Sequence, residues 1–265
     1  MNRIQETFRR LADKQEKALI AYVMAGDPTL EETDAYVLQL AKAGADIIEL
    51  GVPFSDPIAD GPVIQQAAER ALRSGTSLKK ILATVRSLRI KTQVPLVLMA
   101  YYNSIFRYGE SAFCRGAVAA GVDGLIVPDM PPDEAGTLWS LAEKAGLDVI
   151  FLLAPTSTFK RETTVARMSR GFIYYVSLTG ITGAKLTDKA DVGKKVREIR
   201  RYTKTPVAVG FGIATPDDAR EVARIADGVI VGSALVKIIA ENGKSGVADR
   251  IGTFTRSLKA ATLPA

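Results

Sequence analysis

One motif recurs along the chain and limits the folds open to it. The segments AKAGADIIEL, AVAAGVDGLIVP, AEKAGLDVIFL and ARIADGVIVG each join the end of an amphipathic stretch to an apolar, β-branched run. Several of these stretches end in glycine, which tolerates the left-handed conformation that closes many helices. A junction repeated in this way indicates successive β-strand and α-helix units.

The apolar runs have the length and composition of strands that are covered on both faces of a parallel sheet. There are eight of them: 18–26, 46–51, 95–102, 123–129, 148–155, 172–177, 206–212 and 227–232. Eight such units predict a (β/α)8 TIM barrel. A doubly wound sheet is the alternative, but it more often has a Gly-rich dinucleotide fingerprint after its first strand, and AYVMAGDPTLEE lacks that spacing.

The chain reads as one unit from end to end. It has 265 residues, 47% of them hydrophobic, and no linker or low-complexity segment interrupts the pattern. We therefore expect residues 1–265 to form a single barrel domain. The opening MNRIQETFRRLADK predicts an extra helix that closes the bottom of the barrel, and SGVADRIGTFTRSLKAA predicts the last helix.

Composition excludes several classes of protein. The single cysteine, Cys114, rules out a disulfide framework and fits a reducing compartment. The opening segment lacks the apolar stretch of a signal peptide, and no run approaches membrane-spanning length, so we expect a soluble, cytoplasmic protein. The net charge of +6 favours anionic ligands, but the basic residues are scattered and do not favour nucleic-acid binding.

The chain contains no histidine, which removes Ser-His-Asp and Cys-His nucleophiles and the usual zinc sites. No lysine stands at a strand end, where a Schiff-base aldolase or an enzyme with covalently held pyridoxal phosphate would need one. These absences predict acid–base chemistry that is carried by carboxylates, without a cofactor or a metal in this chain.

Carboxylates stand where a barrel places its active site, at the carboxyl ends of strands and in the loops after them. Glu49 ends an apolar strand, where partial desolvation raises the pKa of a carboxyl group toward neutrality. Asp60 lies in the next loop and is either a site residue or a turn former, and turn formation is favoured for Asp56. Asp129 follows another strand, where a structural hydrogen bond and a catalytic role both remain open.

Two Gly-rich turns follow the seventh and eighth strands, where barrels commonly bind phosphate. Gly212 and Gly232 let backbone N–H groups approach an anion, and Ser233 can cap the next helix and donate to phosphate. Ordinary capped turns are the other interpretation. The polar loop 177–189 predicts a mobile lid or a plain solvent loop.

Aromatic side chains also fall at strand ends, where they either line a pocket for a flat aromatic group or fill the core. They are Tyr22, Tyr101, Tyr174 and Phe211.

Several of these segments together resemble the tryptophan synthase alpha chain family. The resemblance covers about residues 15–258 and includes ELGVPFSDPIADGP, PLVLMAYYN, GLIVPDMPPDE, TGITGA, VGFGI and DGVIVGSALVKII. It implies a (β/α)8 barrel that splits indole-3-glycerol phosphate into indole and glyceraldehyde 3-phosphate by a retro-aldol step. It also implies an α2β2 complex with a beta chain that holds pyridoxal phosphate and receives the indole through a tunnel.

The resemblance implies a role for individual residues. Glu49 would be the general acid/base, and Asp60 would hydrogen-bond the indole nitrogen. The phosphate-binding positions would be Gly183, Gly212, Gly232 and Ser233, and the indole end would be lined by Tyr22, Tyr101, Tyr174 and Phe211. Thr182 would belong to the lid that closes over Asp60, and the loop with Asp56 would face the beta chain.

Three positions depart from the pattern of the family. Some members have Arg where Leu178 stands, the family often has Pro where Ser104 stands, and some members have Phe in place of Tyr22. None of these removes a catalytic group. A stand-alone indole-releasing lyase and a catalytically silent regulatory subunit remain as alternative functions, although intact Glu49 and Asp60 argue against the second.

Overall fold

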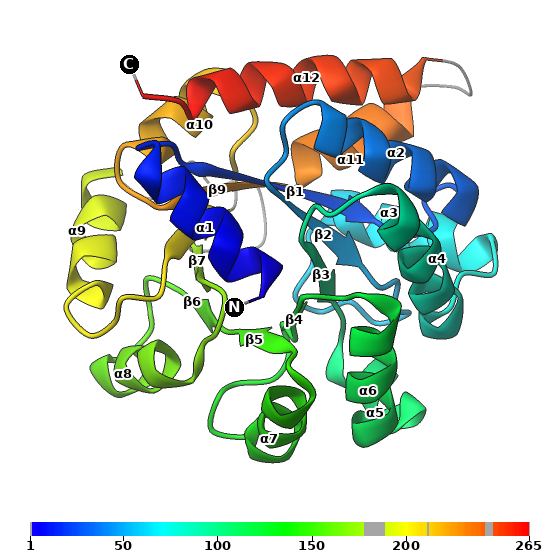
Figure 1. Ribbon diagram of the computed structural model, residues 1–265, viewed down its shortest axis with the longest axis horizontal. Coiled ribbons are helices and arrows are strands. Elements are labelled where there is room, and N and C mark those ends of the chain that lie inside the picture. The colour runs from blue at the N-terminus through cyan, green and yellow to red at the C-terminus, as the bar shows by residue number, and fades with distance from the viewer. Residues whose placement is uncertain (1, 178–188, 211, 242–245, 265) are drawn as a thin grey trace.

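The computed structural model describes residues 2–177, 189–210, 212–241 and 246–264. Its strands form one parallel sheet. In spatial order they are β5 (Asp148–Ile150), β4 (Gly124–Ile126), β3 (Leu96–Met99), β2 (Ile47–Gly51), β1 (Ala18–Met24), β9 (Gly228–Val231), β8 (Val207–Gly210), β7 (Ile173–Val176) and β6 (Leu152–Leu153). The two edge strands are consecutive in the chain, so the sheet closes into a ring (Figure 1).

The predicted (β/α)8 barrel is thus confirmed, with one difference. The fifth apolar run is divided at Phe151 into β5, which pairs with β4, and β6, which pairs with β7. The N–H of Phe151 donates to the hydroxyl of Ser169 at 3.1 Å, outside the strand ladder, while its carbonyl accepts from Tyr174 at 3.1 Å. One side-chain acceptor therefore interrupts the ladder without opening the barrel.

Helices surround the ring of strands (Figure 1). Their bounds are α1 (Arg3–Asp13), α2 (Leu30–Lys42), α3 (Pro62–Arg73), α4 (Leu78–Lys91), α5 (Tyr102–Tyr108), α6 (Glu110–Ala120), α7 (Gly136–Ala145), α8 (Phe159–Met168), α9 (Lys189–Ile199), α10 (Pro216–Ala223), α11 (Ser233–Glu241) and α12 (Val247–Ala261). Gly121 and Gly146 close α6 and α7 in the left-handed conformation, as the repeated junction predicts.

The helix α1 lies across the middle of the ring in Figure 1 and covers the bottom of the barrel. Its apolar side chains Ile4, Phe8 and Leu11 are buried in one cluster with Ile20 and Val97 from the barrel interior. The predicted bottom-closing helix is therefore confirmed, as is the last helix, α12, which packs against α2 and α10.

Strand side chains alternate between the barrel interior and the helical layer. On β2, Ile47 joins the interior cluster, whereas Ile48 and Leu50 join the larger cluster under the helices. By the same alternation Glu49 points into the barrel, one layer above Ile47. Side chains on a strand alternate in direction with a period of two residues, and this alternation places the carboxyl group of Glu49 inside the barrel.

The aspartates of the repeated junction have a structural task at the barrel bottom. Three of them accept the backbone N–H of a residue at the start of the neighbouring strand, at 2.8 to 2.9 Å: Asp46 from Leu19, Asp123 from Leu96, and Asp227 from Val207. At the remaining junction, Asp148 Oδ2 accepts no hydrogen bond from any described residue. The repeat thus reflects a recurring need to satisfy strand N–H groups that have no ladder partner.

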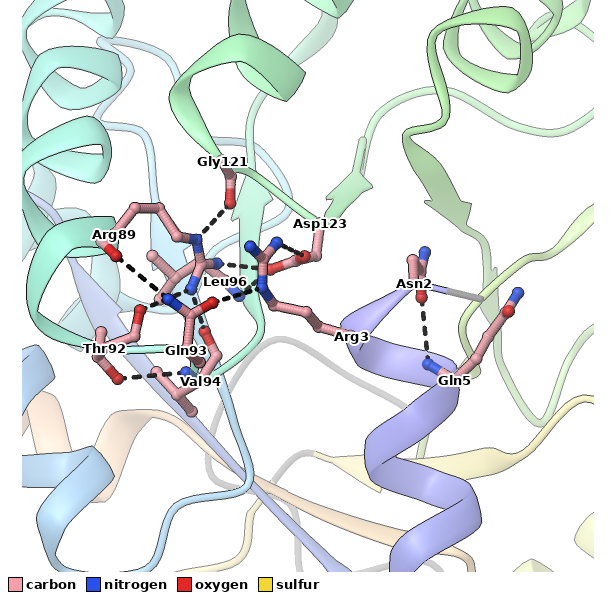
Figure 2. Close-up of polar contacts among 10 residues, drawn as sticks. All are labelled: Asn2, Arg3, Gln5, Arg89, Thr92, Gln93, Val94, Leu96, Gly121 and Asp123. Carbon is pink, nitrogen blue, oxygen red and sulfur yellow. Dashed lines mark hydrogen bonds and ion pairs between the residues drawn. The ribbon is translucent and has the colours of Figure 1, made fainter.

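Figure 2 shows one of these carboxylates, Asp123, with its two arginine partners. Arg89 approaches its Oδ2 at 2.5 Å and Arg3 approaches its Oδ1 at 2.9 Å, so α4 and α1 are both tied to the start of β4. Arg89 also donates to the carbonyl of Gly121 at 2.7 Å and to that of Val94 at 2.7 Å. A nearly buried charge is satisfied here by several partners, which is what its burial requires.

Candidate active site

A cavity of about 800 Å³ opens at the carboxyl ends of the strands. Its floor and walls combine strand ends with the loops that follow β2, β6, β8 and β9. Its lining includes Tyr22, Asp60, Ile64, Met99, Leu152, Leu153, Thr156, Ser157, Arg161, Tyr174, Gly212, Ile230, Gly232, Ser233 and Lys237. The position is the one at which a barrel gathers its functional groups.

Glu49 is fully buried behind the cavity wall, next to Tyr22 and Tyr174, which line the cavity. Tyr22 is its register partner on β1, and neither carboxylate oxygen accepts a hydrogen bond from any described residue. Burial raises the pKa of Glu49 from 4.5 to about 8. A buried carboxyl group that keeps its proton at neutral pH is suited to donating that proton.

Asp60 lies at the rim of the cavity and is half-buried. Burial raises its pKa from 3.8 to about 6, and a hydrogen bond with Tyr101 opposes this rise. The hydroxyl of Tyr101 also accepts the backbone N–H of Ala59 at 2.9 Å, which fixes the loop beside Asp60. The structure therefore brings Glu49 and Asp60 to one site with different pKa values, as assigning one acid and one base requires.

Tyr22 and Tyr174 both line the cavity, and each lies close enough to Glu49 and Asp60 to interact with both carboxyl groups. The pKa of each phenol is raised well above its ordinary value, first by burial and then by the charges of Glu49 and Asp60. Both phenols therefore stay neutral. They contribute flat apolar surface with one hydroxyl each.

Glycines make room for these two rings. A Cβ atom built on Gly51 would overlap the hydroxyl of Tyr22, and one built on Gly210 would lie 2.6 Å from the hydroxyl of Tyr174. Each tyrosine therefore leans over the last residue of the neighbouring strand, β2 or β8. A side chain at either position would displace the ring from the cavity wall.

The other side of the cavity carries basic and small residues. Gly232 and Ser233 form the start of α11, and Gly212 follows β8 with φ of 79°. Lys237 stands one turn into α11, on the same face as Ser233, and forms no ion pair with a described residue. A helix N-terminus with a nearby ammonium group suits an anionic substituent.

Some predicted residues have another placement. Asp129 is exposed and accepts the N–H of Tyr102 at 2.9 Å, so it caps the start of α5. Asp56 is exposed and accepts from its neighbour Ser55 at 2.6 Å within the turn. Phe211, Leu178, Thr182 and Gly183 lie outside the described residues.

Sequence reasoning missed several residues of the cavity wall. Lys237 could have been found from its spacing of four after Ser233 on a helix. Arg161 and the hydroxyl run Thr156–Thr158 precede or begin α8, and no local motif distinguished them from an ordinary helix start. Arg161 reaches Asp133 at 3.4 Å.

The described part of the chain has neither a cluster of metal-binding side chains nor a membrane-spanning helix. No group of three histidine, cysteine, aspartate or glutamate side chains there is placed to bind a metal ion. None of the helices within those ranges has the length and apolar character needed to cross a lipid bilayer.

Known proteins match this chain along its whole length. A family model described as the tryptophan synthase alpha chain matches residues 8–262. The tryptophan synthase alpha chain of Geotalea daltonii is 52% identical over 260 residues and that of Geobacter sulfurreducens is 51% identical over 261, with at least 98% of each chain covered.

Solved structures agree with these relatives. Tryptophan synthase subunit alpha from Legionella pneumophila superposes with a TM-score of 0.91 at 39% identity, covering 99% of this chain and 98% of that one. A chain of Mycobacterium tuberculosis tryptophan synthase superposes with a TM-score of 0.92 at 39% identity, covering 100% and 99%. The chain belongs to the tryptophan synthase alpha chain family, whose members are carbon–carbon lyases of tryptophan biosynthesis.

Proposed function

We propose that this chain cleaves indole-3-glycerol phosphate to indole and glyceraldehyde 3-phosphate, with Glu49 as general acid and base and Asp60 as its partner. The observation that carries this proposal is a fully buried Glu49, without a hydrogen-bond partner among the described residues, that shares the neighbours Tyr22 and Tyr174 with the cavity-lining Asp60. Family membership supplies the reaction, and the geometry supplies the groups to perform it.

The proton transfers follow from the two pKa values. Glu49, with a pKa of about 8, enters the reaction protonated and gives its proton to C3 of the indole ring. The resulting carboxylate takes the proton of the side-chain hydroxyl. The carbon–carbon bond then breaks, its electron pair restores the aromatic ring, and the hydroxyl carbon becomes the aldehyde. Glu49 ends the cycle protonated, as it began.

Asp60, with a pKa of about 6, is ionised at neutral pH. It accepts a hydrogen bond from the indole N–H, which becomes positively charged once C3 is protonated. A carboxylate fixed against charge that develops in the transition state lowers the barrier. Tyr22, Tyr101 and Tyr174, with Phe211, would hold the flat ring between these acids.

The phosphate end lies across the cavity. Gly212, Gly232 and Ser233 would hold the phosphate through backbone N–H groups and one hydroxyl, with Lys237 balancing its charge. Gly183 completes this set in the family resemblance, and Thr182 belongs to the lid.

The same resemblance supports a beta-chain partner in an α2β2 complex, to which the exposed loop with Asp56 would turn. Pyridoxal phosphate would stand on that partner, and this chain would need no cofactor of its own. A cytoplasmic location would fit the free, buried Cys114.

The test is a spectroscopic assay for indole released from indole-3-glycerol phosphate, with and without a beta chain. We expect turnover by the wild type, strong stimulation by the beta chain, and loss of turnover in Glu49→Gln and Asp60→Asn. Full turnover by Glu49→Gln would contradict the mechanism. Equal rates of indole release with and without the beta chain would favour a stand-alone lyase. No indole release in either case would favour a regulatory subunit.

A further inference from the structure

Asp60 differs from Glu49 in how the fold holds it. Glu49 stands within a strand, whereas Asp60 stands in the connection between β2 and α3, one residue before the cap Gly61. Its direction therefore depends on contacts that fix this connection. Within the connection, the N–H of Asp60 donates to the carbonyl of Pro57 at 3.0 Å.

One contact reaches Asp60 from the helix that follows it. The side-chain amide of Gln65 donates from Nε2 to the backbone carbonyl of Asp60 at 2.8 Å. On the other side, the Tyr101 hydroxyl accepts from Ala59. The peptide group after the Asp60 Cα is thus held by Gln65 of α3, and the one before it by the Pro57 carbonyl. Tyr101, which follows β3, holds the next peptide group back along the chain.

The helix α3 is itself anchored to β1 and to the turn that follows β1. Arg70 forms a two-point ion pair with Asp27, at 2.7 and 2.8 Å, and Asp27 is only 1% exposed. The buried face of α3 packs in one cluster with Tyr22 and Met24 of β1. A donor on α3 is therefore held in a constant position relative to the cavity floor.

We infer that Gln65 is a positioning residue for Asp60: its amide holds the Asp60 carbonyl so that the carboxyl group faces the cavity. This inference rests on the role of Asp60 in the proposed function. The adjacent Gln66 is the same residue type without this contact, which makes it a matched control. It is exposed and forms no hydrogen bond with a described residue.

The environment of Asp60 provides a readout for its position. Tyr22, Tyr101 and Tyr174 face Asp60, and two of them, Tyr22 and Tyr174, also face Glu49. Arg161 and Lys237 are the cations of the same cavity. Burial in this wall is the main reason that the pKa of Asp60 is about 6 rather than 3.8. An Asp60 released toward water would titrate at a lower pH.

The experiment compares Gln65→Met with Gln66→Met, which make the same chemical change one residue apart on the same helix. For Gln65→Met we expect kcat to fall about tenfold, since small misplacement of a catalytic group is costly. We also expect the acid limb of kcat/KM to move from about pH 6 toward pH 4. KM and thermal stability should change little, and Gln66→Met should match the wild type. Equal kcat and equal acid limbs in the two variants would overturn the inference.

A second measurement is independent of turnover. Carbon-13 NMR titration of labelled aspartate carboxyl groups, with Asp60→Asn to assign the signal, gives the pKa of Asp60 in the free protein. A lower pKa in Gln65→Met than in Gln66→Met supports positioning even if the wild type releases no indole, which would contradict only the proposed function. An unchanged pKa would overturn the inference. If Gln65→Met does not fold, Gln65→Ala and its control Gln66→Ala, which add no charge beside Asp60, take their place.

Discussion

Replacing Glu49 by glutamine should make the protein more stable while it removes activity. Glu49 is fully buried, and its oxygens have no hydrogen-bond partner among the described residues, so its ionised form is costly. The neutral amide has nearly the same shape and cannot ionise. The variant therefore separates the cost of the charge from the fit of the side chain.

The magnitude follows from proton linkage. The folded state holds the Glu49 proton up to a pKa of about 8, whereas the ordinary pKa is 4.5. Between these values the folded state binds more protons than the unfolded state, so stability falls as pH rises. The gap corresponds to about 5 kcal/mol once the pH exceeds 8, and to almost nothing near pH 4.5.

The assay is thermal unfolding of the wild type and Glu49→Gln from pH 5 to pH 9. The two melting temperatures should be similar near pH 5 and should separate by about 10 °C at pH 8.5, with the variant more stable. Glu162→Gln is the matched control, because Glu162 is also buried but pairs with Lys195 at 2.6 Å. Glu162→Gln removes the charge from this ion pair, so it should lower the melting temperature. The difference from the wild type should not turn into a stabilisation that increases with pH. A constant difference between Glu49→Gln and the wild type over this range would refute the reasoning.

Three further predictions follow from the same structure. Gly51→Ala should lower kcat/KM by at least tenfold, because the new methyl group overlaps the Tyr22 hydroxyl; adding Tyr22→Phe should recover part of the loss in the same steady-state assay. Lys237→Met should raise KM for indole-3-glycerol phosphate several-fold and leave kinetics with the phosphate-free indole-3-glycerol unchanged; equal effects on both substrates would contradict a phosphate role. Arg89→Met should lower the free energy of unfolding by about 3 kcal/mol in a denaturant titration, because it leaves the buried Asp123 short of a partner.

The two carboxyl pKa values also set the pH dependence that the site should show. Asp60 must be ionised, so activity is lost as pH falls through about 6, and Glu49 must be protonated, so activity is lost as pH rises through about 8. A bell-shaped kcat/KM profile between these limits is the expected result, and a profile that stays level below about pH 6 would contradict the need for an ionised Asp60.

Much of the fold was predictable from local pattern. The repeated junction and the eight apolar runs predict the barrel because a parallel strand buried on both faces must be apolar and must be followed by a helix. The division of the fifth run at Phe151 was not predictable, since the hydroxyl that takes its N–H belongs to Ser169, eighteen residues away. The aspartate in each junction was visible as a repeat, but its acceptor role depends on a neighbouring strand.

The candidate site divides in the same way. The sequence by itself determined that Glu49 belongs to an apolar strand, which the structure continues to Gly51, and the period of two then directs its side chain into the barrel. Only the tertiary structure decided that Asp60 comes to the same cavity while Asp56 and Asp129 remain outside as turn and cap. Each of the three follows a strand, and a loop's direction depends on distant partners such as Tyr101 and Gln65. Lys237 likewise belongs to the site only because β9 closes the ring beside β1. The local hydrophobic pattern predicts where the strands lie in the sequence. The placement of loop side chains depends on long-range hydrogen bonds, which no local pattern predicts.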